Sequence, residues 1–312
     1  MIRRHSEVPD NIFELRRHES IGDYARTYGD EITRRYEDLN IIYIPYFPMD
    51  LDLEFLRAVT FPPQFKKIGA VNGIEKNLFE REGSNFRFNE QHILRGVFPQ
   101  PQVLGYLQEQ IVSANWQLRL ALRQLFPHYH SLNVGNITWR MTDTLNEGIH
   151  VDGFGGGKPQ NPQAKNYHRV KLFVNIDSEP RKWWTSFTMP EILKRHRHEY
   201  PEMVGNDLDM LTYRTSREFL QAIPHHEIDI PPMGAVIGEA SSISHAVRYG
   251  RRMVGAECHC LVSDMLDPGK SPHALLPTWL KDAGIGIDPN PKPVELSAAA
   301  QAYEAQNASP AA

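Results

Sequence analysis

The chain has 312 residues, 41% of them hydrophobic, which is enough to bury the core of one large domain. Its 34 basic residues nearly balance its 38 acidic ones, and the net charge of -4 argues against a general nucleic-acid-binding protein. The N-terminus lacks the apolar core of a signal peptide, and no apolar run is long enough to span a bilayer. We therefore expect a cytoplasmic protein.

The first 130 residues predict a mostly helical segment that packs on a core. Residues 1 to 40 are charged and helix-permissive, and LNIIYIPYF at 39 to 47 is typical of a strand. Asp50 is a candidate cap for a helix through DLEFLRAV. Large apolar residues recur at helical spacing through 101 to 127, which predicts a long helix lying against a sheet.

From residue 131 the chain changes to short extended runs separated by Gly and Pro: NVGNITWRMTDT, HRVKLFVNID, HHEIDIPP, GAVIGEA and RRMVGAECHCLV. Their spacing favours an antiparallel sandwich or barrel. We predict an α+β fold whose mainly β core spans 131 to 265, with a helical insertion at 183 to 222. Residues 266 to 312 form a C-terminal extension with a Pro- and Ala-rich end that we expect to be flexible.

The only two cysteines, Cys258 and Cys260, stand two residues apart in an extended segment. Neighbouring positions on one strand do not allow a normal disulfide, so we expect two small buried residues in a reducing compartment. A metal site that includes His259 is disfavoured, because a strand sends that side chain to the opposite face.

The segment LNEGIHVDGFGG, at 145 to 156, places His150 and Asp152 on one face at the end of a predicted strand. A strand, a Pro-x-Gly turn and His245 follow downstream, and this order is typical of a double-stranded β-helix (jelly roll). Two imidazoles and one carboxylate occupy one face of an octahedral Fe(II) and leave three positions open. The alternative is a polar strand end and an unrelated core histidine.

Residues 131 to 262 resemble the core of the Fe(II)/2-oxoglutarate-dependent dioxygenases. The resemblance implies iron at His150, Asp152 and His245, with O2 and 2-oxoglutarate as cosubstrates and ascorbate as an activator in vitro. It also implies a basic residue that holds the far carboxylate of 2-oxoglutarate. Arg252 is the first candidate, because it shares a face with the small apolar residues that follow it, and Arg251 is the one-residue alternative.

Further cations are candidates for the cosubstrate or an anionic substrate. Lys171 lies in the apolar run HRVKLFVNID and is a second candidate anchor for 2-oxoglutarate, unless it reaches solvent at a sheet edge. Arg140, Arg169 and Lys182 are the candidate substrate-binding residues, together with the cluster KRHRHEY. The glycine-rich GFGGGK predicts a lid loop, and Trp183 and Trp184 either cover the site or pack in the core.

Across nearly the whole chain, and most clearly in IHVDGFGG, in VKLFVNID followed by RKWW, and in SHAVRYG, the sequence resembles the bacterial Kdo hydroxylases. That resemblance implies hydroxylation at C3 of a Kdo sugar in the lipopolysaccharide inner core, which gives Ko. The partner would be a lipid-linked sugar, Kdo-lipid A, reached by peripheral contact at the inner membrane.

Two other functions stay open. One is a dioxygenase of the same fold that acts on a small metabolite or a protein side chain. The other is a non-redox jelly-roll protein that binds a metal, such as an isomerase or a sugar sensor. The sequence indicates no nucleic-acid partner, and a homo-oligomer stays open as well.

Overall fold

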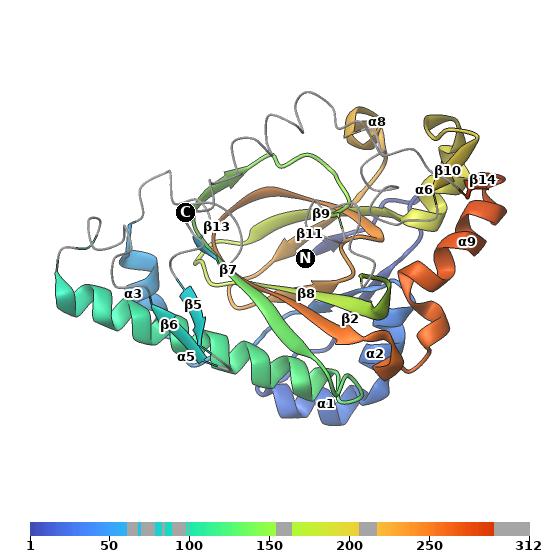
Figure 1. The fold of residues 1–312 in the computed structure, drawn as a ribbon. Coiled ribbons are helices and arrows are strands. Elements are labelled where there is room, and N and C mark those ends of the chain that lie inside the picture. The colour runs from blue at the N-terminus through green and yellow to red at the C-terminus, as the bar shows by residue number, and fades with distance from the viewer. Residues whose placement is uncertain are drawn as a thin grey trace, which may run out of the picture.

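The computed structural model describes residues 1–60, 68–69, 79–82, 85–88, 98, 100–153, 164–205 and 217–289. Most of the predicted glycine-rich lid and the C-terminal tail lie outside these residues. Figure 1 shows a curled sheet at the centre, with one long helix along one side and a group of shorter helices at one end.

The central sheet has ten strands and is mainly antiparallel. One path runs in the order β1-β11-β9-β13-β8-β12-β3-β2, while β7 pairs with β13 and with β4 off this path. The bounds are β1 (Ile2–Arg3), β2 (Ile12–Glu14), β3 (Ile41–Ile44), β4 (Ile68–Gly69), β7 (Asn133–Leu145), β8 (Tyr167–Asn175), β9 (Arg181–Thr188), β11 (His226–Ile230), β12 (Ala235–Gly238) and β13 (Ile243–Leu261). The predicted α+β fold with a jelly-roll core is thereby confirmed.

The longest strand, β13, connects the two halves of the curled sheet. Its first part, from Ile243 to Tyr249, pairs with β9, and its later part pairs with β8 on one side and β7 on the other. The register against β7 shifts between Gly250 and Arg252, which marks a bulge or irregularity. Two small sheets, β10 (Met203–Gly205) with β14 (Gly286–Asp288) and β5 (Phe79–Glu82) with β6 (Asn85–Phe88), lie apart from the central one.

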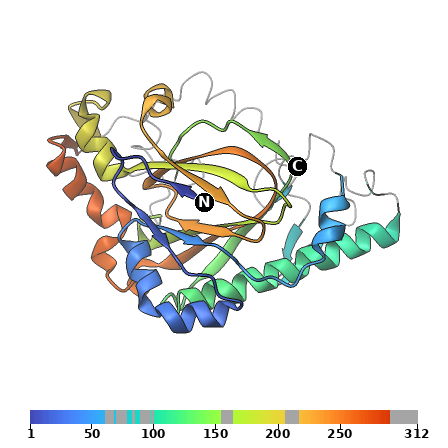
Figure 2. The same ribbon diagram turned by 180° about the vertical axis from the view of Figure 1, so that it is seen from behind.

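Helices cover the sheet in two groups, which Figure 2 shows from behind. The first group is α1 (Ile21–Tyr28), α2 (Asp30–Glu37), α3 (Leu53–Ala58) and α5 (Pro101–Leu125), and the second is α6 (Met189–Arg195), α8 (Arg217–Ala222) and α9 (Pro272–Asp282). Apolar residues of α5 such as Leu107, Ile111 and Leu118 pack in one core cluster with Val254, Ala256 and Cys258 of β13. The predicted long support helix therefore lies where its apolar stripe requires. Among the described residues, no helix combines the length and apolar character that crossing a bilayer requires.

Two predicted elements differ from the structure. Residues 183 to 188 belong to strand β9 and not to a helical insertion, and helix begins only at Met189. The sequence there, WWTSFT, consists mostly of aromatic and β-branched residues that favour strands. Helix α3 is capped by Asp52, whose carboxylate accepts a hydrogen bond from the Phe55 N–H at 2.9 Å, and not by Asp50. The cap therefore lies two residues further along.

Candidate metal centre and cavity

The structure brings His150, Asp152 and His245 together. His150 and His245 form an isolated β-bridge in which each backbone N–H donates to the other's carbonyl at 2.9 Å. The Asp152 N–H donates to the Ala240 carbonyl at 2.8 Å, so all three residues are fixed by backbone pairing. One possible ligand atom from each residue lies within 4.8 Å of the others, which fits a single metal ion.

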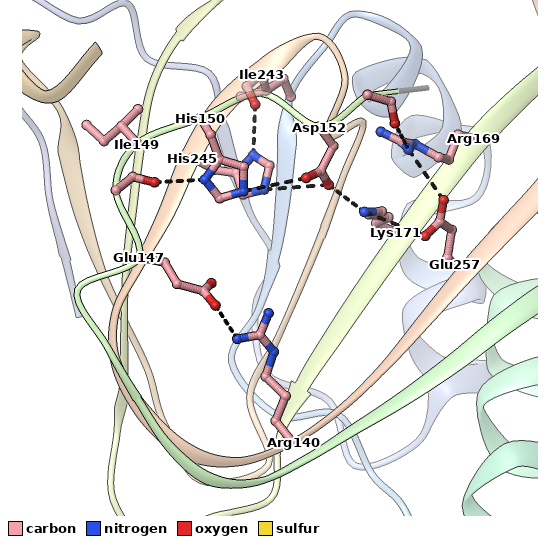
Figure 3. A network of polar contacts seen from close by, with 12 residues as sticks. Arg140, Glu147, Ile149, His150, Asp152, Arg169, Lys171, Ile243, His245 and Glu257 are labelled. Atoms are coloured by element: carbon pink, nitrogen blue, oxygen red, sulfur yellow. Dashed lines mark hydrogen bonds and ion pairs between the residues drawn. The ribbon is translucent and has the colours of Figure 1, made fainter. Parts of the chain in front are cut away.

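Backbone carbonyls fix the protonation of both imidazoles. Nδ1 of His150 lies 2.7 Å from the Gly148 carbonyl, and Nδ1 of His245 lies 3.0 Å from the Ile243 carbonyl. Because a carbonyl only accepts, each Nδ1 carries the proton and each Nε2 presents a lone pair. The two Nε2 atoms lie 3.5 Å and 3.9 Å from the Asp152 carboxylate oxygens (Figure 3). The three side chains are thus a facial set of two nitrogens and one oxygen, the arrangement that suits Fe(II) with open positions.

The charges around the triad keep Asp152 ionised and His245 neutral, the protonation states that bind a metal cation. Burial would raise the pKa of Asp152, but the Lys171 charge, joined by that of Arg169, outweighs it and holds the pKa well below its usual range. Burial, with the neighbouring His150 adding to it, lowers the pKa of His245 to about 4. At neutral pH the site therefore offers an ionised carboxylate and a neutral His245 imidazole.

The triad lies at a cavity of about 130 Å³. Apolar walls come from residues such as Phe173, Trp183 and Val247, and the Trp183 ring lies 5.5 Å from that of His245. The ionisable lining residues comprise three cations and three carboxylates: Arg140, Lys171, Arg181, Glu147, Asp152 and Glu257. With neutral histidines this lining has no net charge, so a bound divalent cation would leave two positive charges that a dianion could balance.

Arg181, at the start of β9, is the third cation of the cavity lining. Its side chain is buried, and no described residue forms a hydrogen bond with its Nη1. Burial, and then the charge of Arg140, lowers the pKa of Arg181 to about 9. Its side chain packs over Gly250, where a Cβ would come within 2.8 Å of the Arg181 Cγ. A buried guanidinium in this state is a site for an anion.

The predicted anchors Arg251 and Arg252 do not line this cavity. Arg251 forms hydrogen bonds of 2.9 Å and 3.1 Å with the carboxylate of Asp177, and Arg252 donates to the Val59 carbonyl at 3.3 Å. The face that Arg252 shares with Val254 packs mainly against the helical layer, although Ala256 of that face also borders the cavity, while Met253, Gly255 and Glu257 of the other face line it. The assumption that the most apolar face points inward was wrong, because the outer face of this strand is also buried.

The other predicted cations are divided between the cavity and elsewhere. Lys171 lines the cavity but contacts Asp152 and lies 3.6 Å from Glu257, and Arg140 lines it while paired with Glu147 at 2.6 Å. The Arg169 side chain is only 2% exposed, between Glu239 and Glu257, which removes it from contact with a substrate. Lys182 and most of the cluster from Lys194 to His198 are exposed outside the cavity.

Sequence reasoning missed Arg181, Glu147 and Glu257. Assigning 183 to 188 to a helix hid the alternation of Arg181 and Trp183 toward the cavity, while Trp184 turns away and stacks on His225 with ring centroids 3.7 Å apart. A strand reading of RKWWTSFT would have placed Arg181 and Trp183 on one face.

Comparison with known proteins supports the fold. No protein-family model matches the chain, and no curated protein matches it in sequence. Structures of the Kdo hydroxylase KdoO, a non-heme Fe(II) alpha-ketoglutarate dependent dioxygenase, are similar at 17 to 18% identity. The complex with alpha-ketoglutarate and Fe(III) gives a TM-score of 0.63 over 86% of this chain and 96% of that one, at 18% identity. The complex with succinate and Fe(III) gives 0.60 over 87% and 96%. The complex with cobalt(II) gives 0.59 at 17% identity over 91% and 100%. These neighbours share the fold over most of their length.

Proposed function

We propose that this protein is an Fe(II)/2-oxoglutarate-dependent dioxygenase that hydroxylates a C–H bond. The observation that carries the proposal is the facial set of His150, Asp152 and His245 at a cavity that also contains Nη1 of Arg181, for which no described residue is a hydrogen-bond partner. When bound, iron would supply the oxidation: 2-oxoglutarate and O2 yield succinate, carbon dioxide and one hydroxyl group on the substrate.

The cavity residues have distinct roles in this proposal. The two Nε2 atoms and the Asp152 carboxylate hold the metal, and Arg181 binds the far carboxylate of 2-oxoglutarate in place of Arg252. A guanidinium is suited to this role because it offers parallel donors to both carboxylate oxygens. Phe173, Trp183 and Val247 exclude water around the reacting groups.

For the substrate we propose C3 of a Kdo sugar on a lipid A precursor. The likeness to KdoO supports this choice, since that protein is a Kdo hydroxylase of the same fold. Arg140 lines the cavity and is our candidate for the sugar carboxylate, which would compete with Glu147 for its guanidinium. Lys182 and the exposed basic cluster are candidates for lipid phosphates, with the protein in the cytoplasm and peripheral at the inner membrane.

Two experiments test the dioxygenase assignment and the Kdo substrate assignment separately. Purified protein with Fe(II) and 2-oxoglutarate under anaerobic conditions should develop the weak visible charge-transfer band of the chelate, and His245→Ala should not. A non-redox isomerase or sensor would give no such band. Mass spectrometry of Kdo-lipid A precursors after incubation with enzyme, Fe(II), ascorbate and 2-oxoglutarate should then show a gain of one oxygen on the Kdo sugar. Turnover on a soluble metabolite with unchanged lipid would refute the Kdo assignment alone.

A further inference from the structure

The two oxygens of the Asp152 carboxylate have different neighbours (Figure 3). Oδ1 lies 3.5 Å from Nε2 of His150, while Oδ2 lies 3.9 Å from Nε2 of His245 and accepts a hydrogen bond from Nζ of Lys171. Lys171 comes from β8, and its side chain is only 16% exposed. A charge-assisted bond in such a site is strong, so one oxygen of this carboxylate is already engaged.

Lys171 is itself held in place by the strand beside it. Glu257 of β13 is the register partner of Lys171 on β8, and its Oε2 lies 3.6 Å from Nζ. Glu257 also accepts from Nη1 of Arg169 at 3.3 Å, and the same Nη1 donates to the Gly153 carbonyl at 2.8 Å. Both the side chain of Asp152 and the backbone after it are therefore tied to one network of β8 and β13.

We propose that Lys171 is a positioning residue that keeps Oδ2 of Asp152 occupied, so that the carboxylate offers the metal a single oxygen. This inference rests on the proposed function. A free carboxylate can bind a cation through one oxygen or two, and the second oxygen would take a position that 2-oxoglutarate needs. Mutation of a group that orients a metal ligand in this way commonly lowers metal affinity or activity by about 10- to 100-fold.

The geometry favours this role over direct anchoring of 2-oxoglutarate. Lys171 already faces two carboxylates, those of Asp152 and Glu257, whereas no described residue forms a hydrogen bond with Nη1 of Arg181. A cosubstrate carboxylate that bound Lys171 would have to displace the carboxylate of Asp152 or Glu257. At Arg181 it would instead accept a hydrogen bond from Nη1, for which no described residue is an acceptor.

The test uses Co(II) as a spectroscopic probe in the full chain. Wild type, Lys171→Met, Lys171→Arg and the control Lys281→Met, an exposed cation on α9 outside the cavity, are titrated anaerobically with Co(II) and their visible spectra compared. Each Co(II) protein is then titrated with 2-oxoglutarate and with pyruvate, which keeps the keto acid but lacks the far carboxylate. Thermal melting without metal checks the fold. If Lys171→Met melts early, the double variant with Glu257→Gln, which also removes the carboxylate facing Lys171, takes its place.

We expect Lys171→Met to retain Co(II), to change its spectrum, and to weaken binding of both keto acids by about 10- to 100-fold. Lys171→Arg and Lys281→Met should resemble wild type. An unchanged Co(II) spectrum would overturn the inference. Weaker binding of 2-oxoglutarate alone, with pyruvate binding unaffected, would also overturn it and would assign Lys171 to the far carboxylate. A wild-type spectrum that His245→Ala leaves unchanged would instead refute the metal centre itself.

Discussion

Gly250 is the residue on which the proposed anchor depends. A side chain there would overlap Arg181, whose Cγ would lie 2.8 Å from the new Cβ. Gly250→Ala should therefore displace the guanidinium and raise the Kd for 2-oxoglutarate about tenfold, equivalent to about 1.4 kcal/mol, measured calorimetrically on Co(II) protein. Gly105→Ala is the matched control, because a Cβ at Gly105 meets nothing within 4 Å. Equal Kd values for both variants would contradict the placement of Arg181.

Removal of one imidazole tests the metal set. His150→Ala should abolish stable Co(II) binding while the melting temperature of the metal-free protein changes little, because backbone pairing to His245, and not the ring, holds this segment. Visible titration measures the metal and circular dichroism measures the melting. A large loss of stability without metal would show that the ring itself supports the fold.

The triad could be predicted from sequence because few residue types bind Fe(II) and their spacing on a strand is restrictive. The proposed 2-oxoglutarate anchor, Arg181, could not be predicted in the same way. The choice of Arg252 depended on which face of β13 points inward, and both faces of that strand are buried. The register shift near Gly250 adds to the ambiguity, since a bulge changes which residues share a face.

At the scale of elements, helix α8 holds the segment after β7 that carries His150. Gln221 of α8 accepts from the Ile149 N–H at 3.0 Å and donates to the Ile149 carbonyl at 2.9 Å. Gln221→Ala should weaken Co(II) binding by about tenfold and leave global stability nearly unchanged, because the lost contacts position a ligand. Co(II) titration and thermal melting measure the two effects. Gln124→Ala, an exposed glutamine on α5, is the control, and matching affinities in both variants would remove this role.

Elements with strong periodicity were predicted well. The helix at 101 to 127 is observed as α5, because its apolar stripe has a sheet to cover. The strand β9 was missed because the helical MPEILKR follows it directly, and Pro190 at the helix start marks the boundary between them. A short segment that could form either a helix or a strand takes the conformation that its neighbours favour. Here those neighbours are β11 and β13, which come together only in the folded sheet.

At the scale of the molecule, Glu37 ties the N-terminal helices to the chain after β13. Its buried carboxylate accepts from the backbone N–H groups of Leu266 and Asp267 at 2.8 Å and 3.0 Å and from the Tyr129 hydroxyl at 3.1 Å. Glu37→Ala should lower the free energy of unfolding by on the order of 3 kcal/mol, because several donors lose their acceptor. Urea denaturation measures this, with the exposed Glu109→Ala as control. A loss equal to that of the control would contradict the role of Glu37.

The continuity of β13 has a consequence for how this chain can change over evolutionary time. His245, Gly250 and Glu257 lie on one uninterrupted strand that pairs with three others. One inserted or deleted residue between them would reverse the direction of every side chain beyond it. We therefore expect the number of residues from His245 to Glu257 to be invariant among functional descendants, even where the residues themselves are replaced. In a library of single-codon insertions across 243 to 261, we expect no functional variant with an insertion between His245 and Glu257.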